Sequence, residues 1–323
     1  MTAEKRQNDE MFIFDIESLF LRRGTCPSNR TSNSDSPFPM HKSAGFVLLL
    51  VPCAVVLAMA GSTSAPNVPQ ESELYGGWLK MYDLKFDEAH SAFAAWKQGH
   101  PDDSLGPASD AAAYLFSELA RLGALESELF VDDSRFKDRA KLRPDPARKA
   151  LFVQEIAQAD RLADAALQRS GVDFNALFVK SMTLGLRADN AGLIEKRSLA
   201  ALSYTKESRV YAERLILAKP DAADAYLGPG LENYLLSLKP APLRVLLRVT
   251  GSNVDRERGV QEIRETAVHG HYLEPFAKLL LAVAALRDNN PVRARELLGE
   301  LHRRFPDNEL YTREMARIDK GAH

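Results

Sequence analysis

Cysteine is nearly absent from this chain of 323 residues, which contains only Cys26 and Cys53. Both precede residue 61, so the remaining chain has no thiol. Disulfides, zinc–thiolate sites and a cysteine nucleophile are therefore excluded from residues 61–323. A chain of this length, 45% hydrophobic, can build a large core without cross-links.

An excess of charge of one sign is also missing. The chain has 42 Lys and Arg against 44 Asp and Glu, for a formal net charge of −2. Proteins that bind nucleic acid show a basic excess, because they must neutralise phosphates. We therefore expect no nucleic-acid partner.

Motifs that carry catalysis are lacking as well. The sequence has no His-Glu-x-x-His, no Gly-x-Ser-x-Gly, no phosphate-binding loop and no dinucleotide fingerprint. Gly228-Pro229-Gly230 is rich in glycine, but it lies within a predicted helix rather than after a strand. We expect it to admit a neighbouring helix closely.

Two groups of polar residues resemble sites but have simpler explanations. His269 and His271 flank a glycine at a helix end, where a cationic side chain is favourable without a metal. Asp102 is explained as a helix cap, and Asp132-Asp133 lies in a charged loop, 130–146, that can contact a partner. We expect no catalytic residue, no metal site and no cofactor.

The N-terminal part of the sequence differs from the rest. Residues 24–39 are polar, and we expect 1–39 to be disordered or a misassigned extension. Residues 40–60 contain a methionine, a basic residue and the apolar run 46–60, with Ala58 and Ala60 in the small-x-small pattern of a cleavage site. This predicts a cleaved signal peptide and export to a bacterial periplasm, with an uncleaved anchor helix as the alternative. A linker, 61–70, then precedes the helical domain, 71–323.

Helical periodicity extends over almost all of the domain, and no segment alternates like a strand. The pattern predicts an all-α fold. The 191–219 helix is unusually long and can break near Ser203. The predicted helices are 71–82, 86–99, 105–122, 147–169, 175–187, 191–219, 223–237, 255–268, 274–287, 291–304 and 308–319.

Three helices end in a shared frame, in which a small residue is followed by apolar residues four and seven positions later and a proline twelve positions later. These positions share one helix face, and the proline stops the helix. An acidic residue after each proline is placed to cap the next helix. The three copies are Ala89, Phe93, Trp96 and Pro101; Ser208, Ala212, Leu215 and Pro220; and Ala294, Leu298, Leu301 and Pro306.

This frame resembles the tetratricopeptide repeat (TPR), a helix-turn-helix unit of 34 residues. Gly77 and Phe86 complete the first copy, Tyr226 and Gly230 follow the second, and Leu281 with Ala282 precedes the third. The resemblance implies a right-handed α-solenoid of helical hairpins. The prolines are not spaced by multiples of 34, so the repeats are degenerate.

The resemblance also implies a concave groove that binds a protein or peptide, and hence a non-enzymatic scaffold or adaptor. The groove-facing positions can equally be ordinary packing residues. They are Trp78, Met81, Leu231, Tyr234, Val283 and Arg287.

A weaker local resemblance, over 234–283, is to eukaryotic TPR-type proteins of inclusion-body clearance; it suggests that Lys239-Pro240-Ala241-Pro242 is an insertion between helices. The apolar segment 234–249 raises an alternative function, a lipid- or membrane-associated protein in which Lys239, Arg244 and Arg248 face headgroups. The competing interpretation is that this segment forms the interior of the array.

Overall fold

The computed structural model describes residues 71–124, 143–239, 244 and 255–321, which lie in the compact unit Ser64–His323. Every regular element of these residues is helical, and the predicted all-α class is confirmed. The elements are α2 (Glu71–Tyr82), α3 (Phe86–Gly99), α4 (Leu105–Arg121), α7 (Pro146–Arg169), α8 (Phe174–Asp189), the π-helix η1 (Asn190–Ile194), α9 (Ser198–Ala218), the 3-10 helix η2 (Ala223–Tyr226), α10 (Leu227–Ser237), α12 (Arg256–His269), α13 (Glu274–Arg287), α14 (Pro291–Arg304) and α15 (Glu309–Asp319).

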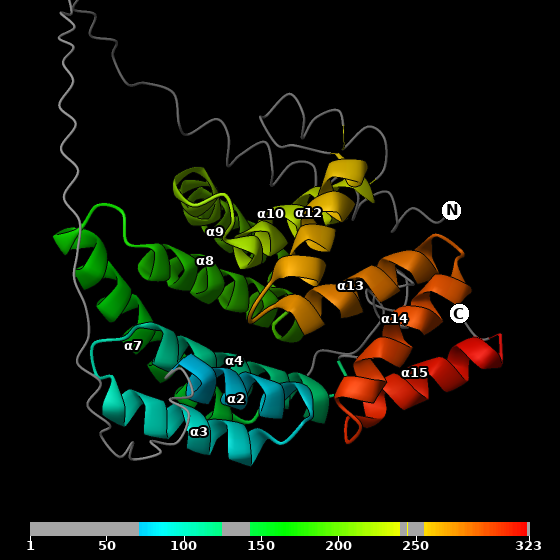
Figure 1. The fold of residues 1–323 in the computed structure, drawn as a ribbon, viewed down its shortest axis with the longest axis horizontal. Helices are drawn as coiled ribbons and strands as arrows, with labels where there is room; N and C mark the ends of the chain where they lie inside the picture. The colour runs from blue at the N-terminus through cyan, green and yellow to red at the C-terminus, as the bar shows by residue number, and fades with distance from the viewer. Residues whose placement is uncertain (1–70, 125–142, 240–243, 245–254, 322–323) are drawn as a thin grey trace, which may run out of the picture. The chain divides into compact units, whose positions relative to one another are not determined.

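The helices pack in the order of the chain. Each described helix lies against the next one, from α2 through to α15, and α4 also contacts α2 and α8 (Figure 1). This pattern is expected when each amphipathic helix buries its apolar stripe on its sequence neighbour. The fold is therefore a succession of local helix pairs.

The predicted helix-ending frame has the same backbone geometry in its three copies. After the last helical residue, the next N–H donates to the carbonyl four positions back: His100 to Trp96 at 2.8 Å, Lys219 to Leu215 at 2.7 Å and Phe305 to Leu301 at 2.8 Å. The small residues Ala89 and Ala294 that open two of the frames are completely buried. Proline has no backbone N–H, so placing it after this residue removes no hydrogen bond from the helix.

Two further helices end in this frame without a proline. In α7 the spacing begins at Ala159, and Ser170 N–H donates to Ala166 at 2.9 Å; Gly171 stands at the proline position. In α12 it begins at Gly259, and Gly270 N–H donates to Thr266 at 2.8 Å, with His271 at the proline position. The proline of the predicted frame is therefore absent from both copies.

The caps differ from the prediction by one residue. The residue after Asp102, Asp103, accepts from Leu105 N–H at 3.0 Å, and Asn308 rather than Asp307 accepts from Leu310 N–H at 3.0 Å. Asp307 instead pairs with Lys85 at 2.6 Å. After Pro220, Ala222 precedes η2 and no side chain caps it, so the prediction that Asp221 caps the next helix is wrong.

The break in the predicted 191–219 helix lies at a different place. The chain leaves α8 through η1, turns at residues 195–197 and enters α9 at Ser198, so Ser203 lies inside a continuous helix. Lys196 takes a positive φ of 54° in this turn. A β-turn-like reversal at a lysine has no signature in the sequence, unlike a glycine or proline.

Glycines bring two helix pairs into close contact. An added Cβ on Gly77 would lie 2.4 Å from the Phe93 ring, between α2 and α3. The approach of α10 to α12 is closer in backbone terms, because a Cβ on Gly259 would lie 2.7 Å from Tyr234 N and 2.8 Å from Gly230 O. At this crossing the two backbones touch with no side chain between them.

The first and last hairpins of the domain also meet. Tyr82 OH donates to Tyr272 O at 2.8 Å, and Asn308 Nδ2 donates to Tyr82 O at 2.8 Å. The Tyr82 and Phe305 rings lie 5.7 Å apart. In Figure 1 the ends of α2 and of α14 and α15 adjoin accordingly. The first and last helices of the domain therefore contact each other in addition to the packing of consecutive helices.

Replacing Gly259 with alanine tests the close crossing of α10 and α12. The added methyl has no room between two backbones, so we expect Gly259→Ala to lower the free energy of unfolding by about 1–3 kcal/mol. Denaturant titration followed by circular dichroism measures this change.

Gly185→Ala is the matched control, because Gly185 lies inside α8 with nothing within 4 Å of an added Cβ. That substitution should stabilise the protein by up to about 1 kcal/mol through helix propensity. Equal effects of the two substitutions would contradict the close crossing.

Candidate functional site

Three of the six residues predicted to line a groove are core residues. Trp78, Met81 and Tyr234 expose 1%, 2% and 4% of their surface, and Trp78 Nε1 donates to Ser109 Oγ at 2.9 Å. These three side chains do not line an open groove in this conformation, and they have the packing role that the sequence left open as the alternative. Leu231, Val283 and Arg287 are half-buried on α10 and α13.

The side chains that face inward from the first, middle and last hairpins form an aromatic cluster. The Tyr272 ring lies 5.5 Å from Trp78, 6.3 Å from Tyr75 and 6.2 Å from Phe178, measured between ring centroids. Tyr272 is 6% exposed. Where the resemblance implied an open inner wall, the aromatic cluster of Tyr75, Trp78, Phe178 and Tyr272 packs against itself.

The sequence offered one signal for Tyr272. It follows the helix-ending frame of α12, at the position where Asp102 and Asp307 follow their prolines. His271 stands at the proline position there, so the proline-containing frame of the sequence does not include Tyr272. His271 itself stacks on Tyr75, with ring centroids 4.4 Å apart.

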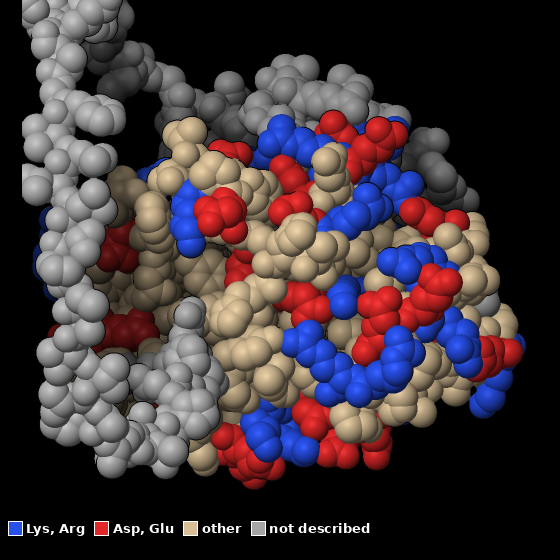
Figure 2. Space-filling model, viewed as in Figure 1, with Lys and Arg blue, Asp and Glu red and all other residues tan. Residues whose placement is uncertain are grey.

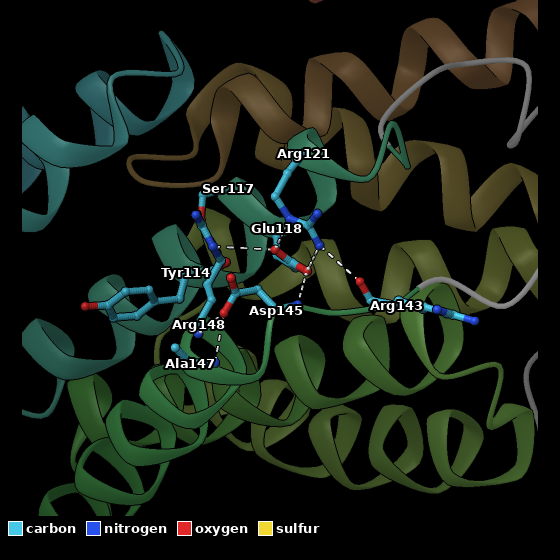
Figure 3. A network of polar contacts seen from close by, with 8 residues as sticks. All are labelled: Tyr114, Ser117, Glu118, Arg121, Arg143, Asp145, Ala147 and Arg148. Atoms are coloured by element: carbon cyan, nitrogen blue, oxygen red, sulfur yellow. Dashed lines mark hydrogen bonds and ion pairs between the residues drawn. The ribbon is translucent and has the colours of Figure 1, made fainter.

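A network of charged side chains joins α4 to α7 and is shown in Figure 3. Glu118, with 5% of its side chain exposed, accepts from Arg121 at 2.6 and 2.8 Å and from Asp145 N–H at 2.8 Å. Arg148 approaches the same carboxylate at 3.5 Å and donates to Ser117 Oγ at 2.6 Å. The hydrogen bonds from Arg121 hold the pKa of Glu118 below its ordinary value.

A second charged group lies further along the same helices and includes α3. Lys97 contacts Asp110 at 2.6 Å and Glu155 at 2.9 Å, and His90 Nδ1 lies 2.5 Å from Asp110. The other oxygen of Glu155, Oε2, is buried without a hydrogen-bond partner. Burial raises the pKa of Glu155 even though Lys97 acts to lower it.

These two networks tie α3, α4 and α7 together. Each carboxylate is held by a cation of a neighbouring helix or turn, and the His90 ring lies against Tyr114 at 4.0 Å. Breaking one partner of such a pair would leave a buried charge without compensation. Their placement accounts for the register of α3, α4 and α7.

The candidate histidine pair also has a structural role. The carboxylate of Asp224 accepts from the N–H groups of His271, Tyr272 and Leu273 at 3.0–3.1 Å, just before α13. An acidic group is favourable at a helix N-terminus, where free N–H groups accumulate. Across the described ranges no group of three or more His, Cys, Asp and Glu side chains is arranged to hold a metal ion.

Asp189, at the end of α8 before the π-helix, has an unusual environment. Burial raises its pKa from 3.8 to about 7. The folded state therefore holds a proton on Asp189 at pH values where the unfolded chain has lost it.

Several predictions fall outside the described residues. These are the cleavage-site residues Ala58 and Ala60, the paired Asp132-Asp133 and most of the 234–249 segment. Within the described part of that segment, Tyr234 and Leu236 are buried, while Leu235 is 46% exposed. No helix in the described parts of the chain is both long and apolar enough to cross a membrane.

Charge is mixed on the face shown in Figure 2, where basic and acidic side chains alternate rather than gather by sign. On comparison with known proteins, no family model, no curated protein and no solved structure matches this chain.

The raised pKa of Asp189 predicts how stability depends on pH. Because the pKa is higher in the folded state, this group's contribution is complete below the ordinary value of 3.8 and is lost as pH rises through about 7. Asp189→Asn keeps the site neutral and removes that loss. We expect the variant to melt several degrees above the original chain at about pH 8.5, and at nearly the same temperature at about pH 4.

Thermal unfolding by circular dichroism at the two pH values measures this difference. Glu155, whose pKa burial also raises, leaves some pH dependence in both proteins. A variant that shifts the melting temperature equally at both pH values would exclude titration of Asp189 as the cause.

Proposed function

We propose that this protein is a non-enzymatic scaffold that binds a protein or peptide, built as a right-handed TPR-like solenoid of degenerate hairpins. The observation that carries the proposal is the helix-ending frame, present at α3, α7, α9, α12 and α14 with a small buried residue at its start. Repeating units of this kind stack on one another and present continuous surfaces. Their usual use is recognition rather than chemistry.

The polar groups of the domain support this function. The charged side chains around Glu118 and around Lys97 form ion pairs with one another, and these pairs help to fix how α3, α4 and α7 are aligned. A repeat scaffold needs such contacts because degenerate repeats lack a uniform apolar interface. The buried carboxylates thus have a structural explanation in which no substrate takes part.

Three of the predicted groove residues are only partly buried, and they lie on α10 and α13. Leu231 on α10 and Val283 with Arg287 on α13 are half-buried, and the latter two are four residues apart on one helix face. Half-buried apolar residues beside an arginine are typical of binding surfaces. We assign partner contact to these three residues.

Capture from cell-envelope extract tests the proposal. The chain should recover a specific partner, and Leu231→Ala combined with Val283→Ala should reduce recovery about tenfold, as for residues at an interface centre. Val292→Ala is the matched control, because Val292 is 69% exposed on α14 and lies outside this surface. Recovery of no specific partner, or equal recovery by all variants at equal melting temperature, would exclude this assignment.

We further propose that the protein is exported and loses residues 1–60, on the basis of the apolar run and the alanines at 58 and 60. N-terminal sequencing of the protein from a secreting host should begin at Gly61. A start upstream of residue 46 would favour the uncleaved anchor instead.

A further inference from the structure

The junction of α3, α4 and α7 holds two buried carboxylates beside one ammonium group. Asp110 on α4 and Glu155 on α7 are 4% and 6% exposed. Lys97 on α3 lies between them, with its Nζ 2.6 Å from Asp110 Oδ2 and 2.9 Å from Glu155 Oε1. With both carboxylates ionised, these three side chains carry one negative charge in excess. We call them, together with His90, the junction cluster.

The charged networks on either side of the junction cluster are balanced. In each of them two carboxylates face two cations, which offset their charge. These groups are Glu118 and Asp145 with Arg121 and Arg148 between α4 and α7, and Asp160 and Asp164 with Lys180 and Arg187 between α7 and α8. The four cations are therefore engaged with carboxylates of their own and do not offset the excess charge of the junction cluster.

The four carboxylate oxygens of the junction cluster are not equally satisfied. Asp110 Oδ1 lies 2.5 Å from His90 Nδ1, and Asp110 Oδ2 accepts from Lys97. Glu155 Oε1 also contacts Lys97, whereas Glu155 Oε2 is buried and has no hydrogen-bond partner. A buried ionised oxygen without a partner is costly, and adding a proton removes its charge. A proton also needs no room beside the oxygen, in contrast to a metal ion or an organic cation.

We propose that the junction cluster is a proton-binding site, in which Glu155 holds one proton on Oε2 when the chain is folded. The proton balances the charges, because Lys97 then offsets Asp110 alone and a neutral His90 donates to Asp110 from Nδ1. Loss of this proton at higher pH weakens the contacts that join α3 to α4 and α7. The inference does not depend on what the domain binds.

The other titratable groups at the junction keep the charge states that this site requires. Burial acts to lower the pKa of Lys97, but its contacts with Asp110 and Glu155 raise that pKa above the ordinary value, so Lys97 stays charged. Burial raises the pKa of Tyr114, the α4 side chain that lies against His90, so Tyr114 stays neutral. Burial also raises the pKa of Glu155 above its ordinary value of 4.5, which favours the neutral carboxyl group.

The pH dependence of stability tests the proton, with Asp189→Asn as the parent chain because it lacks the titration of Asp189. A raised pKa in the folded state makes the contribution of Glu155 complete below 4.5, and the contribution is lost as pH rises through the raised value. We expect the folding equilibrium constant of the parent to fall over this range. Glu155→Gln should remove up to about tenfold of that fall per pH unit, which is the dependence that one proton produces. Urea titrations at several pH values measure these constants.

Glu118→Gln in the same parent is the matched control, because Glu118 is a carboxylate 4% exposed at the contact of α4 with α7. Hydrogen bonds from Arg121 lower its pKa, so its contribution is complete above the ordinary value of 4.5 and is lost as pH falls below it. The control should therefore lower stability by the same factor at every pH above about 5.5 and keep the pH dependence of the parent.

Infrared spectroscopy of the folded proteins observes the proton directly, through the C=O stretch of a neutral carboxyl group. At neutral pH the parent should show this band, Glu155→Gln should reduce it by one carboxyl group, and Glu118→Gln should leave it unchanged. Lys97→Met removes the cation that favours ionised Glu155, so the band should persist to higher pH in that variant.

Three results would overturn the proposal. They are a parent without the band at neutral pH, a band that Glu155→Gln leaves at full intensity, and equal pH dependence of stability with and without Glu155→Gln. If Glu155→Gln does not fold, a band whose loss occurs at the same pH in the parent and in Lys97→Met would exclude Glu155 as its source.

Discussion

Close approach of paired helices at one small residue is the constraint on which the rest of the structure depends. A hairpin of two amphipathic helices can bury its apolar stripes only if the axes come near enough for the larger side chains to interlock. Ala89, Ala159 and Ala294 meet this requirement with a methyl group, and all three are completely buried. At Gly259 even a methyl group is excluded, because the opposite helix contributes its own glycine, Gly230.

The turns that follow these helices depend on the same geometry. After the last helical residue, the next N–H donates a hydrogen bond to the carbonyl four positions back, and the chain then leaves the helix. Proline suits this exit but is not required for it, as Gly171 and His271 show at the equivalent positions. The frame is therefore defined by packing, and proline only reinforces it.

The contact between the chain's first and last hairpins changes what the domain can do. In an open array, inward-facing aromatic residues would be available along the concave side. Here the Tyr272 ring packs against Trp78, and the Tyr82 hydroxyl donates a hydrogen bond to the Tyr272 carbonyl. The aromatic cluster is therefore part of a buried core that α2 shares with the last helices of the domain.

Local features of the sequence determined the helices. The bounds of α2, α3, α13 and α14 agree with the predicted ranges residue for residue, because the apolar period that defines each lies within about twenty residues. A proline in the first turn also marks the start of α13 and of α14. The tertiary structure alone decided which apolar residues are buried. From the sequence, Trp78 and Met81 were equally compatible with an inner groove wall and with ordinary packing. The structure places both in the core, where the Trp78 ring lies 5.5 Å from Tyr272, far away in the sequence. The pKa of Asp189 depends in the same way on what surrounds it in space, since its neighbours in the sequence are compatible with an ordinary exposed carboxylate. How deeply a side chain is buried depends on all the residues that surround it in space, and many of these are far away in the sequence.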